Sequence, residues 1–217
     1  MKLKILQDII KKKNSKSEFG IVTNLKNGES EIYEPGKNLS KEIEVYKNQI
    51  EKFFKSKKSG VIDGTEIFVE SYIRPIKVII VGAVHIAQFL ISFAKSLNFE
   101  ISIIDPRGYF ATSQRFPDIK IINKWPDEAF KEIDTDENTA LIALTHDPKI
   151  DDPALQHSLK KNFYYIGALG SKKTHENRCK RLKESGFSDK EINSIHGPIG
   201  IKLGGKSAPE IALSIIA

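Results

Sequence analysis

Short apolar runs alternate with segments of helical periodicity from Ile76 onward, and this alternation predicts the architecture of most of the chain. Five apolar runs predict strands, at residues 77–81, 100–104, 118–122, 139–144 and 163–166. Between them, apolar residues recur at intervals of three and four, the spacing of an amphipathic helix. Strands that alternate with helices predict a parallel sheet. We therefore predict an α/β fold over residues 76–217, an open parallel sheet with helices on both faces.

Residues 1–75 follow a different pattern, which predicts a separate, small α+β domain at the amino terminus. An amphipathic helix begins the chain, with apolar positions Leu3, Ile5, Leu6, Ile9 and Ile10. Strands are predicted at residues 20–25, 31–34 and 65–71. Asn27-Gly28 predicts a hairpin turn between the first two, because both central residues of that turn type need positive φ.

Three finer predictions concern where helices and loops begin. Ser40 is expected to cap a single helix that runs to about Lys57. The pair Asp152-Pro153 is expected to be the cap and first residue of another helix. Residues 196–200, with two glycines and a proline, are expected to form a loop.

The first strand of the predicted sheet ends in a glycine turn that opens a helix. Residues 82–87, GAVHIA, match the first and third positions of the G-x-G-x-x-G/A fingerprint for dinucleotide binding. The second position is Val84, at the point where a pyrophosphate comes closest to the backbone. The turn therefore indicates a Rossmann-like fold, whereas the branched side chain of Val84 counts against a bound dinucleotide.

Asp105 follows the second strand, 105 − 82 = 23 residues after Gly82. The fingerprint expects an acidic residue ~20 residues on, which accepts a hydrogen bond from the ribose 2′-OH. A strand-end Asp also suits an Asx turn with Pro106. Arg107 offers a further alternative, contact with a 2′-phosphate.

Four predicted loops follow the carboxyl ends of the strands, where ligands bind in open α/β sheets. Their candidate ligand-binding residues are Gly82, Ala83, Val84, His85, Asp105, Arg107, Thr145, His146, Asp147, Gly167, Gly170 and Ser171. His146 is a candidate ligand or acid–base group, and His196, outside these loops, is another. The loop at residues 167–173 either holds a phosphate on its backbone N–H groups and lysines or is a plain connection with solvated lysines.

Charge and cysteine content narrow the classes of function. The net charge of +6 comes from dispersed lysines without interleaved aromatics, which indicates a solvated surface and no nucleic-acid site. The lone Cys179 excludes an internal disulfide and a cysteine zinc cluster, which fits the cytoplasm. No apolar run approaches the ~18–20 residues of a membrane span. No metal-binding pattern stands out, and no catalytic residue is assigned.

Several stretches together resemble a known family. They are the glycine turn, IDPRGYFATSQRFPD, ALTHDPKIDDPAL, YYIGALGSKKT and the final HGPIGIKLGGKSAPEIALSI. Residues 66–217 resemble the C-terminal Rossmann-like domain of the xanthine dehydrogenase accessory factor family (XdhC/CoxI type). Two departures are visible. The usual GAGH turn is GAVH, and residues 1–65 carry neither a G-S-x-P-R nor a G-G-C-x-E stretch.

The resemblance implies a maturation chaperone more than an enzyme. Such a protein binds molybdenum cofactor (molybdopterin) and assists its sulfuration and its insertion into a molybdenum hydroxylase such as xanthine dehydrogenase. A cysteine desulfurase is a second implied partner, and a homodimer is left open. Two alternatives remain: an NAD(P)-dependent oxidoreductase, and a degenerate Rossmann module used only for protein–protein contact.

Overall fold

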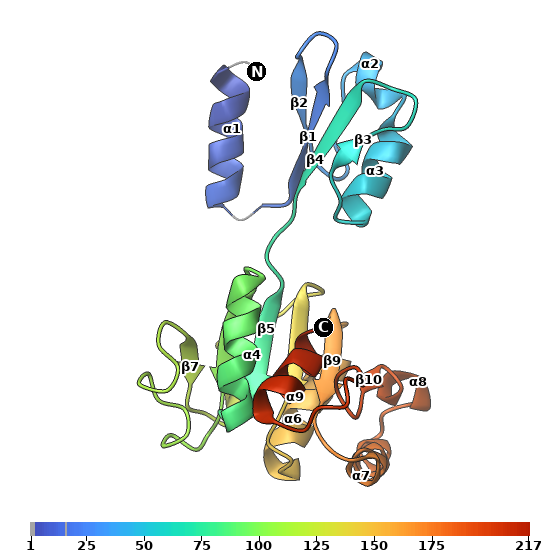
Figure 1. Cartoon of the computed structure of the whole chain (residues 1–217). Helices are drawn as coiled ribbons and strands as arrows, with labels where there is room; N and C mark the ends of the chain where they lie inside the picture. Colours follow the sequence, from blue (N-terminus) through green and yellow to red (C-terminus); the bar gives the residue numbers. More distant parts are fainter. Residues whose placement is uncertain (1–2, 16) are drawn as a thin grey trace. The chain divides into compact units, whose positions relative to one another are not determined.

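The computed structural model describes residues 3–15 and 17–217, which form two compact units. Unit 1 is Met1–Arg74 and unit 2 is Pro75–Ala217 (Figure 1). No helix in the described residues is long and apolar enough to cross a membrane.

Unit 1 is a four-stranded antiparallel sheet with helices on both faces. Its strands, in the spatial order β2-β1-β4-β3, are β1 (Phe19–Asn24), β2 (Ser30–Tyr33), β3 (Gly60–Val61) and β4 (Ile67–Tyr72). Its helices are α1 (Leu3–Asn14), α2 (Lys41–Glu44) and α3 (Lys47–Lys55). One face of the sheet packs on α1, where Ile9 joins Phe19 and Ile21 in a buried cluster. On the other face, Ile50 of α3 lies in a second cluster with Val69.

The prediction of one helix from Ser40 to Lys57 is wrong, because α2 ends at Glu44 and α3 begins at Lys47. Ile43 and Ile50 lie in the same buried cluster. Their seven-residue spacing is also that of one face of an unbroken helix, so periodicity gave no sign of the break. The Ser40 hydroxyl donates to Glu31 across a distance of 2.5 Å, which ties this segment to β2.

Unit 2 contains a six-stranded parallel sheet in the order β10-β9-β8-β5-β6-β7. The strands are β5 (Lys77–Val81), β6 (Glu100–Ile104), β7 (Lys120–Ile122), β8 (Thr139–Ala143), β9 (Tyr165–Ala168) and β10 (Ile195–His196). The predicted Rossmann-like parallel sheet is therefore confirmed. The chain leaves β5 toward β6 on one side and later returns to β8 on the other. The crevice between β5 and β8 is thus the switch point at which such sheets bind ligands.

Helices cover both faces of this sheet (Figure 1). They are α4 (His85–Ser96), α5 (Pro126–Ala129), α6 (Pro148–Leu159), α7 (Lys172–Glu184), α8 (Asp189–Ile192) and α9 (Ala208–Ile216). Alternate residues of each strand enter two separate cores, as the period of a strand requires. Ile80 lies in the core with α4 and α9, whereas Ile79 lies in the core with α6, α7 and α8.

The prediction that Asp152-Pro153 starts a helix is wrong. The helix begins one Asp-Pro pair earlier, at Pro148, and the side chain of Asp147 accepts a hydrogen bond from the N–H of Lys149 at 2.9 Å. Asp152 instead forms a bidentate ion pair with Arg181 of α7, at 2.5 and 2.9 Å. Two identical local signals thus lie five residues apart, and a tertiary contact decides between them.

The expected loop at residues 196–200 begins with a residue of the sheet. Ile195 and His196 form β10, which pairs in parallel with Ile166 and Gly167 of β9. A strand of two residues has too few positions to show the alternation of apolar and polar side chains that marks strands in a sequence.

Candidate functional site

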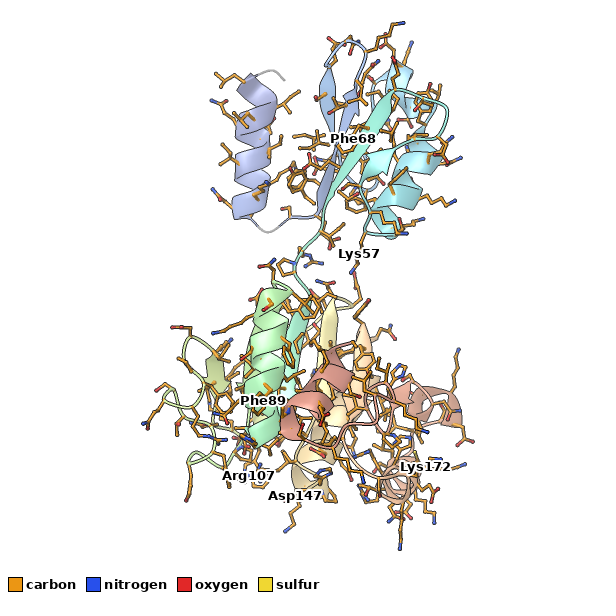
Figure 2. The ribbon with its side chains drawn as sticks, viewed as in Figure 1. Lys57, Phe68, Phe89, Arg107, Asp147 and Lys172 are labelled. Carbon is orange, nitrogen blue, oxygen red and sulfur yellow. The ribbon has the colours of Figure 1, made fainter. Side chains whose placement is uncertain are left out.

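The loops that follow β5, β6, β8 and β9 come to one edge of the sheet. Figure 2 labels Arg107, Asp147 and Lys172 along this edge of unit 2. Charged side chains from different loops interact along this edge. The pKa of Arg107 is raised mainly by its hydrogen bond to Asp105, and the carboxylates of Asp147 and Asp151 raise it further. Groups from separate loops therefore share one electrostatic environment.

The glycine turn after β5 is packed from the side of the switch point. Gly82 has φ +111°, which side chains rarely adopt, and a Cβ there would lie 2.6 Å from the Cγ2 atom of Thr145. Thr145 follows β8, the strand beside β5. Gly82 is therefore required both by its backbone conformation and by the threonine methyl group that rests on it.

Asp105 is fully buried and directed at the same turn. Its Oδ2 atom accepts hydrogen bonds from the N–H of Ala83 at 2.8 Å and from Nη2 of Arg107 at 2.9 Å. Its Oδ1 atom accepts from the backbone N–H and Nε of Arg107, both at 2.9 Å. Burial alone would raise the pKa of Asp105, but these hydrogen bonds outweigh it and lower the pKa below the usual value. The carboxylate is thus ionised and engaged with protein donors on both oxygens, which counts against contact with a ribose.

Arg115 holds the other side of the turn and was not foreseen. Its Nη1 atom donates to the carbonyl of Ala83 at 3.0 Å and to the carbonyl of Phe110 at 2.5 Å. No local pattern marks this role, because Arg115 lies in the irregular segment between β6 and β7. Both polar backbone groups of Ala83 are therefore bonded within the protein.

Val84 and His85 begin α4. Val84 is the residue before the helix, with φ −79°, so the backbone there does not require glycine. His85 begins the helix, its Nδ1 atom lies 3.1 Å from Oε1 of Gln88, and its ring packs edge-on against Phe89.

The loop after β8 is organised by Asp151, a buried carboxylate of α6 that sequence reasoning missed. It accepts hydrogen bonds from the hydroxyl of Thr145 at 2.6 Å, from the N–H of Thr145 at 3.3 Å and from the N–H of His146 at 3.1 Å. Burial raises the pKa of Asp151, although the Thr145 hydroxyl and the charge of Arg178 oppose the shift. These contacts hold His146 at φ +60°, with its side chain exposed.

The loop after β9 separates its candidate residues. Gly167 belongs to β9 itself, and the side chain of Ile199 occupies the space where its Cβ would be. Gly170 has φ +150°, and Ser171 caps α7 by accepting a hydrogen bond from the N–H of Thr174 at 3.1 Å. Gly170 and Ser171 therefore lie at the start of α7, while Gly167 serves packing.

Arg178 of α7 is the second buried charge that the sequence did not reveal. It is only 1% exposed, and its Nη2 atom donates to the carbonyl of Leu169 at 2.9 Å and lies 3.9 Å from Oδ2 of Asp151. Among the residues that the structure describes, its Nε and Nη1 atoms have no hydrogen-bond partner. Its sequence neighbours are mostly charged, so it resembles a solvated residue in the sequence.

His196 lies apart from these loops, in the wall of a cavity on the face of the sheet. The ring of His196 stacks on Tyr165 with centroids 4.6 Å apart. Both line an open cavity of about 730 Å³ against the sheet face, with Val78, Ala140 and Ile142. Its lining contains none of the candidate residues in the four loops.

No metal centre is assembled from the described residues, and the lone thiol is poorly placed to react. No group of three or more His, Cys, Asp or Glu side chains within residues 3–15 and 17–217 could hold a metal ion. The Sγ atom of Cys179 lies 3.5 Å from Nε2 of His175, but burial raises the pKa of the thiol. Only the thiolate is a strong nucleophile, so this environment suppresses its reactivity.

Comparison with known proteins assigns the fold to a family. Residues 78–217 match the model of the XdhC Rossmann domain. The chain belongs to the XdhC family. The resemblance inferred from the sequence motifs is therefore confirmed.

Two curated relatives give the XdhC match its context. The molybdenum cofactor insertion chaperone PaoD of Escherichia coli is 40% identical over 100 residues, which are 46% of this chain and 31% of PaoD. A probable xanthine dehydrogenase subunit from Bacillus subtilis is 29% identical over 155 residues, which are 70% of this chain and 44% of that protein. The matched part of the chain thus spans less than half the length of either relative.

A solved structure extends the likeness in fold to both units. The crystal structure of a protein described as a xanthine dehydrogenase, from Bacillus halodurans, matches this chain with a TM-score of 0.73 at 21% identity. The alignment covers 99% of this chain and 66% of that one. At this identity the likeness concerns the fold alone.

Proposed function

We propose that this protein binds molybdenum cofactor at the carboxyl edge of its Rossmann domain and delivers it to a molybdenum hydroxylase such as xanthine dehydrogenase. The observation that carries the proposal is the XdhC domain match together with 40% identity to a molybdenum cofactor insertion chaperone. Assistance with sulfuration of the cofactor, supplied by a cysteine desulfurase, belongs to the same proposal.

The chemistry of the edge supports a ligand with an anionic group. The start of α7 offers backbone N–H groups, the hydroxyl of Ser171 and the ammonium groups of Lys172 and Lys173. Beneath it lies the buried guanidinium of Arg178. Helix N-termini and cations favour phosphate, and molybdopterin carries one. His146, exposed in the neighbouring loop, and Arg107 are the further groups that we assign to the binding edge.

The structure gives less support to the alternative of an NAD(P)-dependent oxidoreductase. In a dinucleotide site, the glycine turn leaves its backbone open to the pyrophosphate and the acidic residue is free for the ribose. Here Ala83 donates its N–H to Asp105, and Thr145 rests on Gly82. The turn is therefore engaged with the protein at the places where a dinucleotide would bind.

The decisive experiment is an anaerobic titration of the purified protein with isolated molybdenum cofactor, followed by molybdenum and pterin analysis after free ligand is removed. We expect a Kd of about 1 μM or tighter, which corresponds to roughly 8 kcal/mol of binding free energy. Absence of retained molybdenum and pterin would refute the proposal.

Two matched histidine variants locate the binding site. His146→Asn changes an exposed side chain at the edge and keeps a residue type that tolerates positive φ. His196→Asn changes the wall of the cavity on the sheet face. We expect the first to weaken cofactor binding about threefold to tenfold, as loss of one polar contact does, and the second to leave binding unchanged. The reverse result would move the site to the cavity.

A further inference from the structure

Three long helices, α4, α6 and α7, begin at the carboxyl edge of the sheet, each shortly after a strand. The first turns of these helices differ in charge. At α6, the side chain of Asp147 caps the helix and Asp151 is buried in its first turn. At α4, the preceding residue is Val84 and the turn before it is packed by Asp105 and Thr145. At α7, the cap is the neutral hydroxyl of Ser171, and lysines follow it. An added anion is therefore best accommodated at α7.

The start of α7 also has backbone donors to offer. The first N–H groups of any helix lack partners within the helix. The hydroxyl of Ser171 accepts from the N–H of Thr174, one of these groups. Those of Lys172 and Lys173 precede it and face the same end of the helix dipole, which favours negative charge. The ammonium groups of both lysines add to this field, since their side chains are exposed.

Arg178 provides independent support for a ligand here. Long side chains of a helix lean toward its N-terminus, and the Nη2 atom of Arg178 reaches the carbonyl of Leu169, in the loop that precedes α7. The guanidinium is 1% exposed, and within the described residues its Nε and Nη1 donors are unpartnered. Arginine stays protonated in proteins, so a buried guanidinium with two unused donors is costly unless a negative group approaches it.

The protein's own carboxylates leave this charge incompletely matched. Asp151 is 3.9 Å from Arg178 and is engaged by Thr145 and His146. One turn further along α7, Arg181 shows the fully paired alternative, with two short hydrogen bonds to Asp152. The same helix therefore carries one fully paired arginine, Arg181, and one that is only partly paired, Arg178.

We infer that the start of α7, residues 170–173, together with Arg178 beneath it, is a binding subsite for a phosphate monoester. The phosphate accepts hydrogen bonds from the backbone N–H groups and the two lysines, and Arg178 supplies positive charge from below. This inference rests on the proposed function in one respect: the phosphate monoester is that of the pterin cofactor.

The test uses inorganic phosphate as the probe and ¹⁵N amide shifts of the full chain as the readout, at constant ionic strength. We expect saturable shifts at residues 170–173. Ser171→Asp keeps a side chain that caps helices well and places a carboxylate at the site, so phosphate affinity should fall about tenfold or more. Arg178→Met should weaken binding by a similar factor. Arg181→Met, which removes the same charge from the same helix, should change it less than about twofold.

Several results would overturn the subsite. One is saturable shifts at His85 and Ile86 of α4 in place of α7. Another is unchanged affinity in Ser171→Asp, and a third is an equal loss in Arg178→Met and Arg181→Met. If Arg178→Met does not fold, Ser171→Asp decides the matter alone.

Two further binding measurements distinguish failure of this inference from failure of the proposed function. If molybdenum cofactor binds equally well to the wild type and to Ser171→Asp, the subsite is wrong and the proposed function stands. If phosphate binds at α7 but the cofactor does not bind at all, the subsite stands and its assigned source is wrong. NADP is the comparison ligand in that case, because its 2′-phosphate is also a monoester and its competition with phosphate would name the alternative source.

Discussion

The glycine turn before α4 and the loop before α7 occupy equivalent places in the sheet, each between a strand and the helix that follows it. The turn before α4 is closed by the protein itself. Asp105 and Arg115 take both polar backbone groups of Ala83, and Thr145 covers Gly82. The loop before α7 has a neutral cap, two lysines and a buried arginine with unused donors. Equivalent topology thus supports two different uses.

The difference shows that a fingerprint glycine can be retained for packing. Gly82 matches the dinucleotide pattern, yet its positive φ and its contact with Thr145 account for it without a ligand. The loop before α7 carries no general phosphate-binding motif, and the features that suit a ligand are electrostatic. Substitutions at and around the glycine turn test whether the first region is structural, and those at Ser171 and Arg178 described above test the second.

The largest expected effect is on stability, from Asp105→Ala. The substitution removes the acceptor of Ala83 and Arg107 in a buried setting, and we expect the free energy of unfolding of unit 2 to fall by about 3 kcal/mol. Trp125, the only tryptophan of the chain, lies in unit 2 and reports its unfolding in urea by fluorescence. A loss below about 1 kcal/mol would indicate a carboxylate held in reserve for a ligand.

Gly82→Ala should destabilise unit 2 somewhat less, by about 2 kcal/mol, from a strained φ and a clash with the Thr145 methyl group. The double variant with Thr145→Ser removes that methyl group and keeps the hydroxyl. It should recover the part of the loss that is due to the clash, while the conformational cost of positive φ remains. Equal losses in the single and double variants would show that Thr145 does not determine the need for glycine.

Two buried carboxylates should respond to pH with opposite signs. The pKa of Asp105 is lowered, so the stability it contributes is present above the unfolded pKa of ~3.9 and is lost as the pH falls through the lower folded pKa. The pKa of Asp151 is raised by burial, so its contribution is favourable at low pH and is lost as the pH rises through the folded pKa. Urea unfolding of Asp105→Asn and Asp151→Asn between pH 3 and 7 measures both. The stability advantage of the wild type over Asp105→Asn should shrink toward pH 3. The stability advantage of the wild type over Asp151→Asn should grow toward pH 3. If both advantages changed in the same direction with pH, the opposite pKa shifts assigned to the two carboxylates would be contradicted.

The smallest expected effect is that of Val84→Gly on nucleotide binding. Restoring the fingerprint glycine leaves Ala83 bonded to Asp105 and Gly82 under Thr145. We therefore expect NAD and NADP to shift the Tm of this variant by less than about 1 °C, which corresponds to occupancy well below saturation. A shift of several degrees would show that Val84 alone had closed the turn.

Sequence reasoning recovered the parallel sheet, the position of the glycine turn and the family. It recovered them because buried strands, helical spacing and glycine turns are local patterns. It failed where two local signals competed, as at Asp147-Pro148 and Asp152-Pro153, and where spacing fitted two outcomes, as for Ile43 and Ile50. It left Asp105 open between a ligand contact and an Asx turn, because strand-end position alone does not show which donors will meet a carboxylate.

The amino-acid sequence by itself determined five of the six strands of the parallel sheet and the loops that reach its carboxyl edge, because burial periodicity is written into neighbouring residues. Only the tertiary structure decided which groups the residues of those loops contact. Asp151 and Arg178 acquire their roles by being buried between loops that are distant in sequence. The cost of a buried charge depends on the groups that surround it in space, and local spacing carries no record of those groups.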